Sequence, residues 1–382
     1  ISFYTFQSMG YLIDVYNGKY APEKNPAKFA LFVSFFPQLI QGPIARFDQL
    51  ENQLVTPHRF DLDGIERGLL LMLWGWFKKK VIADRALSLV EAVFGSQSAY
   101  GGAVIVVGVL FYSLQQYADF SGGIDLVTGI AQLFGIELAP NFKRPYFSVS
   151  LGDFWRRWHI TLGAWMRDYV FYPFALTRPV SRMSKALKKK AGTHIARALP
   201  AALGNILVFL LVGVWHGAQM NYVLWGLYNG VILAFTALVE PVYKRMNDRL
   251  PRLTASGGFH VFRILRTFLV VNIGWYFDRC VRVSDAFAML HKTFFAFNAQ
   301  QLFDGTLDTL GLAAKDYRIL LVATIILFVV SFMQERGVKI RDFVLSRPLA
   351  LRWAVLYAFI FFVLATFGGS NVAASGFMYA VF

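Results

Sequence analysis

The stretch that decides the fold is VFLLVGVWHGAQMNYVLWGLYNG, residues 208–230, in which one imidazole, that of His216, lies inside an apolar run. Gly213 and Gly217 stand on either side of it, and a second apolar run begins at Tyr222. An ionisable side chain at membrane depth is costly and is by default a functional candidate. The two glycines equally suit close helix packing, with His216 hydrogen-bonded to a neighbouring helix. The stretch alone leaves a functional role and a packing role open.

The composition of the 382-residue chain is that of an integral membrane protein. Hydrophobic residues make up 56% of it and charged residues 16%, whereas soluble domains carry about 25% charged residues. Its 38 Lys and Arg against 23 Asp and Glu leave a net charge of +15. The cations gather in short segments between apolar runs, most densely at residues 178–197. This is the pattern of cytoplasmic loops in a membrane protein, and we expect no nucleic-acid partner.

Several kinds of active site are excluded because their residues are missing. Cys280 is the single cysteine, so the sequence offers neither an intrachain disulfide nor a cysteine-based zinc site. The six histidines show no HExxH spacing, and the sequence has no GxSxG elbow, Walker loop or dinucleotide fingerprint. We therefore expect no metal and no bound cofactor.

The first part of the chain is too irregular for a simple series of spans. Residues 29–44 are apolar but interrupted by Pro37 and Pro43, which favours a broken or re-entrant helix that is buried in protein or lines a cavity. Residues 64–94 indicate a helix, with Lys78 to Lys80 as a cationic end at the cytoplasmic interface. Residues 101–115 are apolar enough to span and end in a polar cluster, Gln115, Gln116, Tyr117, Asp119 and Ser121, for which a solvated helix end is the alternative to a functional role.

Residues 141–165, NFKRPYFSVSLGDFWRRWHITLGAW, are aromatic, polar and basic at once. They are too charged to span, and they favour an amphipathic or re-entrant segment at the membrane interface.

The later part of the chain alternates regularly between apolar runs and cationic loops. About 20 apolar residues are needed for each crossing, and we predict spans at residues 198–215, 222–242, 261–277, 319–333 and 353–367. With residues 178–197 in the cytoplasm, every later cationic loop returns to that side, and His216 lies toward the outer half of its helix. The expected fold is all-α, a single domain over residues 1–382 forming a polytopic transmembrane helical bundle. The chain begins at Ile1 inside an apolar segment, so we expect it to be the later part of a longer protein.

Motifs spread over most of the chain carry a family likeness. They are ISFYTFQSMGYLIDVY at residue 1, FFPQLIQGPIARF at 35, YADFSGGIDLVTGIAQLFGI at 117, NFKRPYFSVSLGDFWRRWHITLGAWMRDYVFYPF at 141, GVWHGAQMNYVLWGLYNG at 213 and the tail GFMYAVF at 376. Together they make the chain resemble the membrane-bound O-acyltransferase (MBOAT) family, in the branch of bacterial alginate O-acetyltransferases and teichoic acid D-alanyl transferases. The resemblance implies a bundle with re-entrant and interfacial helices enclosing a tunnel, preceded by N-terminal helices that this chain lacks.

The resemblance also implies roles for individual residues. It makes His216 the catalytic histidine, and His159 of the FWRRWH motif the second histidine of the same passage. Six further residues are implied as supports or substrate-binding groups: Asp119, Asn141, Arg144, Asp153, Trp155 and Arg156. For Asp153 and Arg156 an interfacial ion pair is the alternative, and for Trp155 an aromatic belt residue.

A buried imidazole without any other catalytic motif favours a direct transfer. We expect neutral His216 to act as general base on an acceptor hydroxyl that attacks an acyl thioester, with His159 orienting substrate or stabilising the oxyanion. Arg144 or Arg156 would hold an anionic headgroup or carrier phosphate. The co-substrate is expected to be acetyl-CoA or an acyl-carrier thioester, supplied at the cytoplasmic side by the donor or a carrier protein.

The resulting expectation is a multi-pass O-acyltransferase of the bacterial plasma membrane. It would move an acyl group, preferably acetyl, to an exported cell-surface polysaccharide, either directly or through an extracytoplasmic relay protein. The protein itself would be in contact with membrane lipid. D-alanyl transfer to teichoic acid is the alternative within the family. A transporter or flippase would also place His and Arg along a polar path, but would leave its substrate unchanged.

Overall fold

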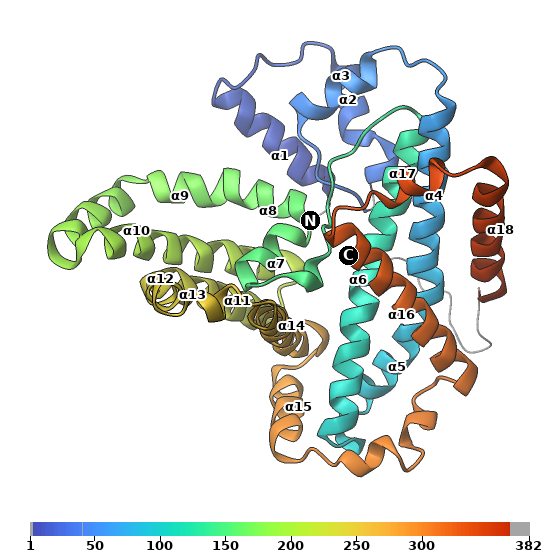
Figure 1. Ribbon diagram of the computed structural model, residues 1–382. Helices are drawn as coiled ribbons and strands as arrows, with labels where there is room; N and C mark the ends of the chain where they lie inside the picture. Colours follow the sequence, from blue (N-terminus) through green and yellow to red (C-terminus); the bar gives the residue numbers. More distant parts are fainter. Residues whose placement is uncertain (1–2, 40, 367–382) are drawn as a thin grey trace. The chain divides into compact units, whose positions relative to one another are not determined.

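The computed structural model describes residues 3–39 and 41–366, and it is 81% helical with no β-strand among those residues. Figure 1 shows helices throughout, and one isolated antiparallel bridge joins Phe142 and Trp158. The predicted all-α class is confirmed. The GFMYAVF motif lies outside the described residues.

The chain divides into two compact units. Unit 1 combines Ile1–Asn141 with His291–Phe382, and unit 2 is Phe142–Leu290. Whether they act as the single domain expected from the sequence stays a prediction.

Unit 1 contains the helices from both ends of the chain. They are α1 (Phe3–Tyr16), α2 (Pro26–Ser34), η1 (Phe36–Gln38), α3 (Phe47–Val55), α4 (Leu62–Trp76), the π-helix η2 (Phe77–Ala83), α5 (Asp84–Gly95), η3 (Gln97–Ala99), α6 (Gly102–Leu133), η6 (Ala299–Leu302), η7 (Thr306–Thr309), α16 (Ala314–Glu335), α17 (Ile340–Leu345) and α18 (Leu349–Thr366).

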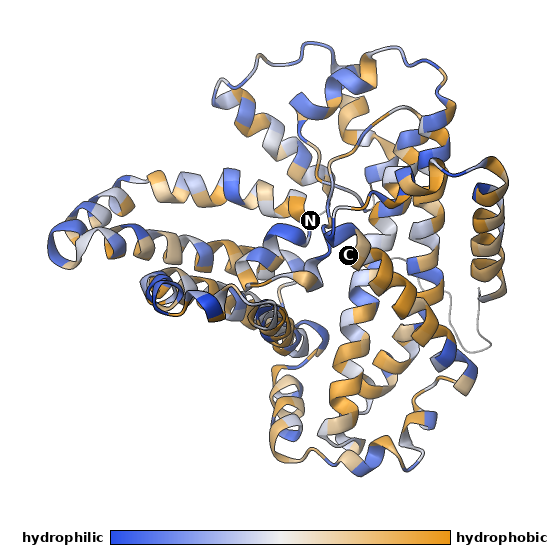
Figure 2. Cartoon of the chain, viewed as in Figure 1, coloured by the Kyte–Doolittle hydropathy of each residue, from blue (hydrophilic) through white to orange (hydrophobic). Residues whose placement is uncertain are grey.

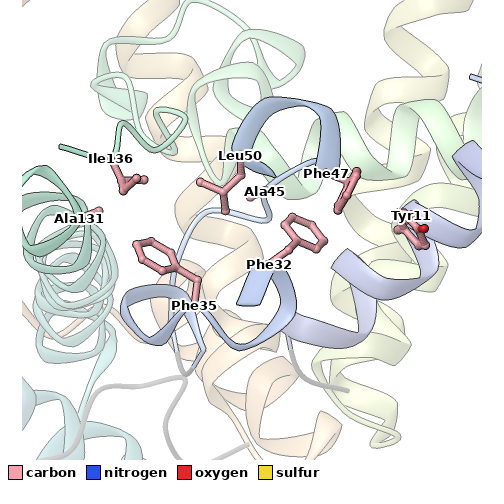
Figure 3. Packing of buried hydrophobic residues seen from close by; sticks show 8 residues of the cluster. All are labelled: Tyr11, Phe32, Phe35, Ala45, Phe47, Leu50, Ala131 and Ile136. Atoms are coloured by element: carbon pink, nitrogen blue, oxygen red, sulfur yellow. The ribbon is translucent and has the colours of Figure 1, made fainter. Parts of the chain in front are cut away.

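The predicted break in residues 29–44 is confirmed. Asn25 caps α2 by accepting a hydrogen bond from the Ala27 amide, and α2 ends at Ser34, after which η1 covers only three residues. The segment is held by an aromatic core (Figure 3) rather than by helical hydrogen bonds. Its buried members are Tyr11, Phe32, Phe35, Ala45, Phe47, Leu50, Ala131 and Ile136.

Helices α4 and α6 cross through paired glycines. A Cβ atom on Gly75 would lie 2.7 Å from the carbonyl oxygen of Gly122, and one on Gly68 would lie 2.7 Å from that of Gly129. Gly68 and Gly75 lie seven residues apart on α4, and Gly122 and Gly129 lie seven residues apart on α6, so the two glycines of each helix face the same side over two turns. Two backbone-to-backbone contacts therefore fix this crossing, as small residues do in membrane helix pairs.

The expectation of a cationic helix end at Lys78 to Lys80 is wrong. The helix continues through η2 into α5, and the side chains of Lys78 and Lys79 are only 4% and 3% exposed. The Lys78 ammonium lies 2.7 Å from Asp125, and that of Lys79 lies 2.9 Å from Asp84 and also pairs with Asp119. Three consecutive lysines look like a solvated end in the sequence, but here two of them are buried and paired with carboxylates: Lys78 with the partly exposed Asp125, and Lys79 with the buried Asp84 and Asp119.

The polar cluster after residue 115 is not a solvated helix end either. Helix α6 runs on to Leu133, and Gln115, Gln116, Asp119 and Ser121 are all buried within it. Their polarity therefore lies inside the unit.

Unit 2 holds the segment around both predicted histidines. Its elements are η4 (Pro145–Phe147), α7 (Leu151–Arg157), α8 (Ile160–Met166), the π-helix η5 (Arg167–Phe171), α9 (Tyr172–Leu176), α10 (Arg178–His216), α11 (Met220–Leu238), α12 (Glu240–Arg249), α13 (Pro251–Thr254) and α14 (Gly257–Arg279). Helix α15 (Val283–Phe295) contains the boundary with unit 1.

Helix α10 is two helices folded back on each other at Gly192, whose φ of 83° lies in the left-handed region. Ser184 Oγ donates to the carbonyl of Ala196 at 2.7 Å. In a straight helix these residues would be about 18 Å apart. Figure 1 shows the chain turning back at the left of the view, where the two parts of α10 meet. The segment predicted as a cationic loop is thus largely helical, with Lys188, Lys189 and Lys190 exposed next to the turn.

Five helices are long and apolar enough to cross a membrane, among the residues described. They are Gly102–Leu133, Arg178–His216, Met220–Leu238, Ala314–Glu335 and Leu349–Thr366. Figure 2 shows hydrophobic residues along most of α16 and α18. Helix α14, over the span predicted at residues 261–277, is long enough but is not among the five, and it carries Arg263, Arg266 and Asn272.

Candidate active site

The turn at Gly192 brings the two predicted histidines together. Residues before the turn contact residues after it, in pairs that lie progressively farther from the turn. Ser184 bonds to Ala196 close to the turn, and the Phe171 ring lies against Gly204 farther away from it. The next pair along the same register is His159 with Trp215, whose ring centroids are 6.2 Å apart. His159 precedes α8 and His216 ends α10, so both imidazoles lie at the end of the helical pair remote from Gly192.

His216 is the last residue of α10 and is partly exposed. The chain leaves the helix through Gly217 in an extended conformation, and a Cβ on Gly217 would lie 2.7 Å from the Tyr222 ring. A Cβ on Gly213 would lie 2.4 Å from the Tyr222 carbonyl oxygen. Both glycines are thus packing positions where α10 meets α11, and this close contact is what places the imidazole at the helix crossing.

Three aromatic rings surround the His216 imidazole. Its centroid lies 4.7 Å from Trp215, 5.2 Å from Trp225 and 6.1 Å from Tyr222, the last in a stacked arrangement. Rigid rings on several sides restrict the orientations open to the imidazole. A partly exposed histidine held in this way can meet a substrate without rearrangement.

His159 is buried at the sharp junction between α7 and α8. Its φ of 46° and ψ of 54° are left-handed, an uncommon conformation for a residue with a side chain. The neighbouring bridge fixes the junction, since the Lys143 amide donates to the Arg157 carbonyl at 2.9 Å. Strained residues of this kind gather at functional sites. Arg144, with a φ of 50°, is another of the three non-glycine residues with positive φ in the described parts of the chain.

Burial lowers the pKa of His159, and the nearby His216 lowers it further. Desolvation disfavours the imidazolium form, so His159 is neutral at pH 7. A neutral imidazole offers one N–H donor and one acceptor nitrogen, which suits it to orient a substrate or donate to an oxyanion.

Two residues that the sequence analysis missed, Asn229 and Trp225, complete the surroundings. Trp155 Nε1 donates to Asn229 Oδ1 at 3.2 Å, and Asn229 Nδ2 donates to the Trp225 carbonyl at 2.9 Å. The Trp155 and Trp225 rings meet edge to face at 5.6 Å, and Trp225 faces His216. A chain of contacts thus leads from α7 through α11 to the imidazole. A buried amide within an apolar run was the available signal for Asn229.

The predicted supports are distributed unevenly. Trp155 lies in this contact chain. Asp153 accepts from the Val149 amide and pairs with Arg157 at 3.2 Å, whereas Arg156 is 72% exposed and lies 3.7 Å from Asp153. Asp153 is thus ion-paired, and whether this pair only stabilises the fold or also supports the reaction stays a prediction. Asp119 and Asn141 belong to unit 1, where both are buried and Asp119 pairs with Lys79.

Within residues 3–39 and 41–366, no group of three or more His, Cys, Asp or Glu side chains is placed to hold a metal ion.

Comparison with known proteins identifies relatives of this arrangement. Residues 23–273 match the family model of membrane-bound O-acyltransferases. The chain is 36% identical over 303 residues to a probable alginate O-acetylase of Pseudomonas syringae pv. tomato, covering 79% of this chain and 52% of the relative. It is 32% identical over 316 residues to a peptidoglycan O-acetyltransferase of Helicobacter pylori, covering 76% of this chain and 55% of the relative.

A more distant relative is a teichoic acid D-alanyltransferase of Bacillus subtilis, 26% identical over 282 residues, with 72% of this chain and 67% of the relative covered. The chain spans about half the length of the acetylating relatives.

Proposed function

Because this chain belongs to the membrane-bound O-acyltransferase family, we propose that the protein transfers an acyl group to a hydroxyl of an exported cell-surface polysaccharide. Acetyl is the preferred acyl group because the relatives at 32% and 36% identity are named as acetylating enzymes. The observation that carries the proposal is the pair of imidazoles at one end of the α8–α10 hairpin, with His216 partly exposed and His159 buried.

The transfer is a direct one in this proposal. His216 takes the proton of the acceptor hydroxyl while that oxygen attacks the thioester carbonyl carbon, and the imidazolium then returns the proton to the departing sulfur. The carbon–oxygen bond forms and the carbon–sulfur bond breaks, with no net proton gained or lost. General-base catalysis of this kind contributes about 10² to 10⁴ in rate. His159 donates a hydrogen bond to the oxyanion or holds the acceptor.

The donor is proposed to be a thioester, either acetyl-CoA or an acylated carrier protein, that arrives from the cytoplasm. The cationic end of unit 2 supports this. His194 Nε2 lies 3.0 Å from the Leu238 carbonyl, so the start of the spanning part of α10 lies next to the end of α11. Exposed Lys188, Lys189 and Lys190 therefore lie at the same end as α12. By the positive-inside rule this end faces the cytoplasm of a bacterial plasma membrane.

The distance along α10 from the turn at Gly192 to His216 determines which side of the membrane the reacting groups would be on. His216 lies 24 residues beyond Gly192 along α10, which is about 36 Å of helix and exceeds the roughly 30 Å of a bilayer core. The acyl group would thus pass from an inner donor to an acceptor, or to a relay protein, near the outer face. The teichoic acid relative makes D-alanyl transfer the second candidate.

The test is mass spectrometry of the surface polysaccharide and teichoic acid from cells with and without the full-length protein. We expect an acetyl or D-alanyl ester that depends on the protein, and its mass names the acyl group. An unmodified polymer whose export depends on the protein would instead support a transporter.

A further inference from the structure

The middle of unit 1 contains buried amide side chains that the proposed reaction does not use. Gln38 and Gln41 lie in the break between α2 and α3, and Gln116 lies on α6; they are 1%, 3% and 5% exposed. Neither amide atom of Gln38, nor Oε1 of Gln41 or Gln116, has a hydrogen-bond partner in the described part of the chain. We refer to these three side chains as the amide cluster.

Contacts with α6 bring the amide cluster onto one strip of that helix. Gln41 Nε2 donates to the Phe120 carbonyl at 3.4 Å, and a Cβ on Gly123 would lie 2.6 Å from Gln41 Oε1. Gln116 is one turn before Phe120 and two turns before Gly123, which places it on the same helix face. The short helix η1, which ends at Gln38, also packs against α6. Gly123 is the residue that lets the Gln41 amide approach the helix so closely.

Keeping these amides buried has a cost. An unsatisfied buried polar group costs about 1–3 kcal/mol, and apolar side chains of similar shape would avoid that cost. The nearby charges do not need the amides, because Lys78 pairs with Asp125, and Lys79 with Asp84 and Asp119. Buried polar groups without protein partners call for a ligand or ordered water. The carboxamide has no charge and both donates and accepts, which matches a hydroxyl group.

We propose that the amide cluster is a binding site for hydroxyl groups inside unit 1. The hydroxyls belong either to water or to the sugar acceptor; only the sugar version rests on the proposed function.

The test is the accessibility of single cysteines in the full-length protein, reconstituted in lipid nanodiscs. Cys280, whose pKa burial raises to about 12, is first replaced in a Cys280→Ala background. Gln41→Cys and Gln116→Cys are then compared with Ala118→Cys, a fully buried position on the same helix. A water-soluble methanethiosulfonate should label the two former glutamine positions at least about tenfold faster, because a dehydrated thiol loses its reactive thiolate. Equal, slow labelling at all three positions would overturn the proposal.

An oligosaccharide of alginate distinguishes the two sources of hydroxyl. Protection of Gln116→Cys by this probe assigns the site to sugar, and labelling without protection assigns it to water. The readout is independent of acyl transfer, so it stands even where the proposed function fails.

Thermal unfolding gives a second readout if the cysteine variants fold poorly. Gln38→Leu should leave the Tm unchanged or raise it, since neither amide atom of Gln38 has a partner in the described part of the chain, and the exposed Gln300→Leu serves as control. A lower Tm for Gln38→Leu alone would show that this amide is bonded within the protein and would contradict the proposal.

Discussion

At the scale of single residues, the sequence singled out both imidazoles and Trp155, but not the rest of their surroundings. His216 is conspicuous because it interrupts an apolar run, and the family likeness singled out His159. Trp225 and Asn229 were missed because their importance depends on how α7, α10 and α11 meet, which sequence spacing does not encode. The catalytic roles of the two histidines stay predictions, and so do the supporting roles of Asp119, Asn141, Arg144, Asp153, Trp155 and Arg156.

Asn229 should act as a positioning residue for His216. Asn229→Leu removes the acceptor for Trp155 Nε1 and so loosens the ring that supports Trp225. We expect kcat to fall by about tenfold, as misplacement of a catalytic group allows, with KM little changed. Asn272→Leu is the matched control, because Asn272 likewise is buried and donates to the carbonyl four residues before it. Equal kcat losses in both variants would indicate a general packing effect.

The lowered pKa of His159 predicts how stability depends on pH. Below about pH 6.5 this histidine binds a proton in the unfolded chain but not in the folded protein. The free energy of unfolding therefore decreases as the pH is lowered. We expect a lower Tm at pH 5 than at pH 7 in thermal unfolding, and a smaller difference in His159→Gln. The same pH dependence in both proteins would show that His159 is not the group responsible.

At the scale of elements, hydropathy predicted where helices run but not how they turn or pair. The spans expected from residue 198 onward overlap α10, α11, α14, α16 and α18, although the span expected over residues 222–242 continues past the end of α11 at Leu238. The hairpin at Gly192 was missed because residues 178–197 are cationic, and a strongly charged stretch looks like a loop even when it is helical. Lys78 and Lys79 were misassigned for the related reason that Lys79 pairs with Asp119, 40 residues away along the chain, and Lys78 with Asp125, 47 residues away.

The α4–α6 crossing should not tolerate a side chain at Gly75. In Gly75→Ala the new methyl group meets the Gly122 carbonyl at 2.7 Å, and overpacking of this kind costs about 1–3 kcal/mol. We expect a lower Tm and no change in the ester formed. Gly95→Ala is the control, since a Cβ there meets nothing within 4 Å. A Tm for Gly75→Ala as high as that of the control would mean that the two helices do not cross so closely.

At the scale of the whole molecule, composition established membrane character, and the match over residues 23–273 established the family. Acyl donor and acceptor could not be read from the sequence, because neither leaves a mark in composition or spacing. The structure adds that these groups of residues are divided between the two units, which the order of the sequence does not reveal. Both imidazoles belong to unit 2, whereas the buried ion pairs and the amide cluster belong to unit 1.

The central claim is that His216 and His159 form the centre of acyl transfer. It is tested most directly by the ester content of the acceptor polymer in cells that express full-length His216→Ala, His159→Ala or His194→Ala at equal abundance. His194 is the matched control, since it lies on the same helix at the opposite end and bonds to the Leu238 carbonyl. We predict loss of the ester in His216→Ala, a strong decrease in His159→Ala and a normal content in His194→Ala. A normal ester content in His216→Ala would contradict the account.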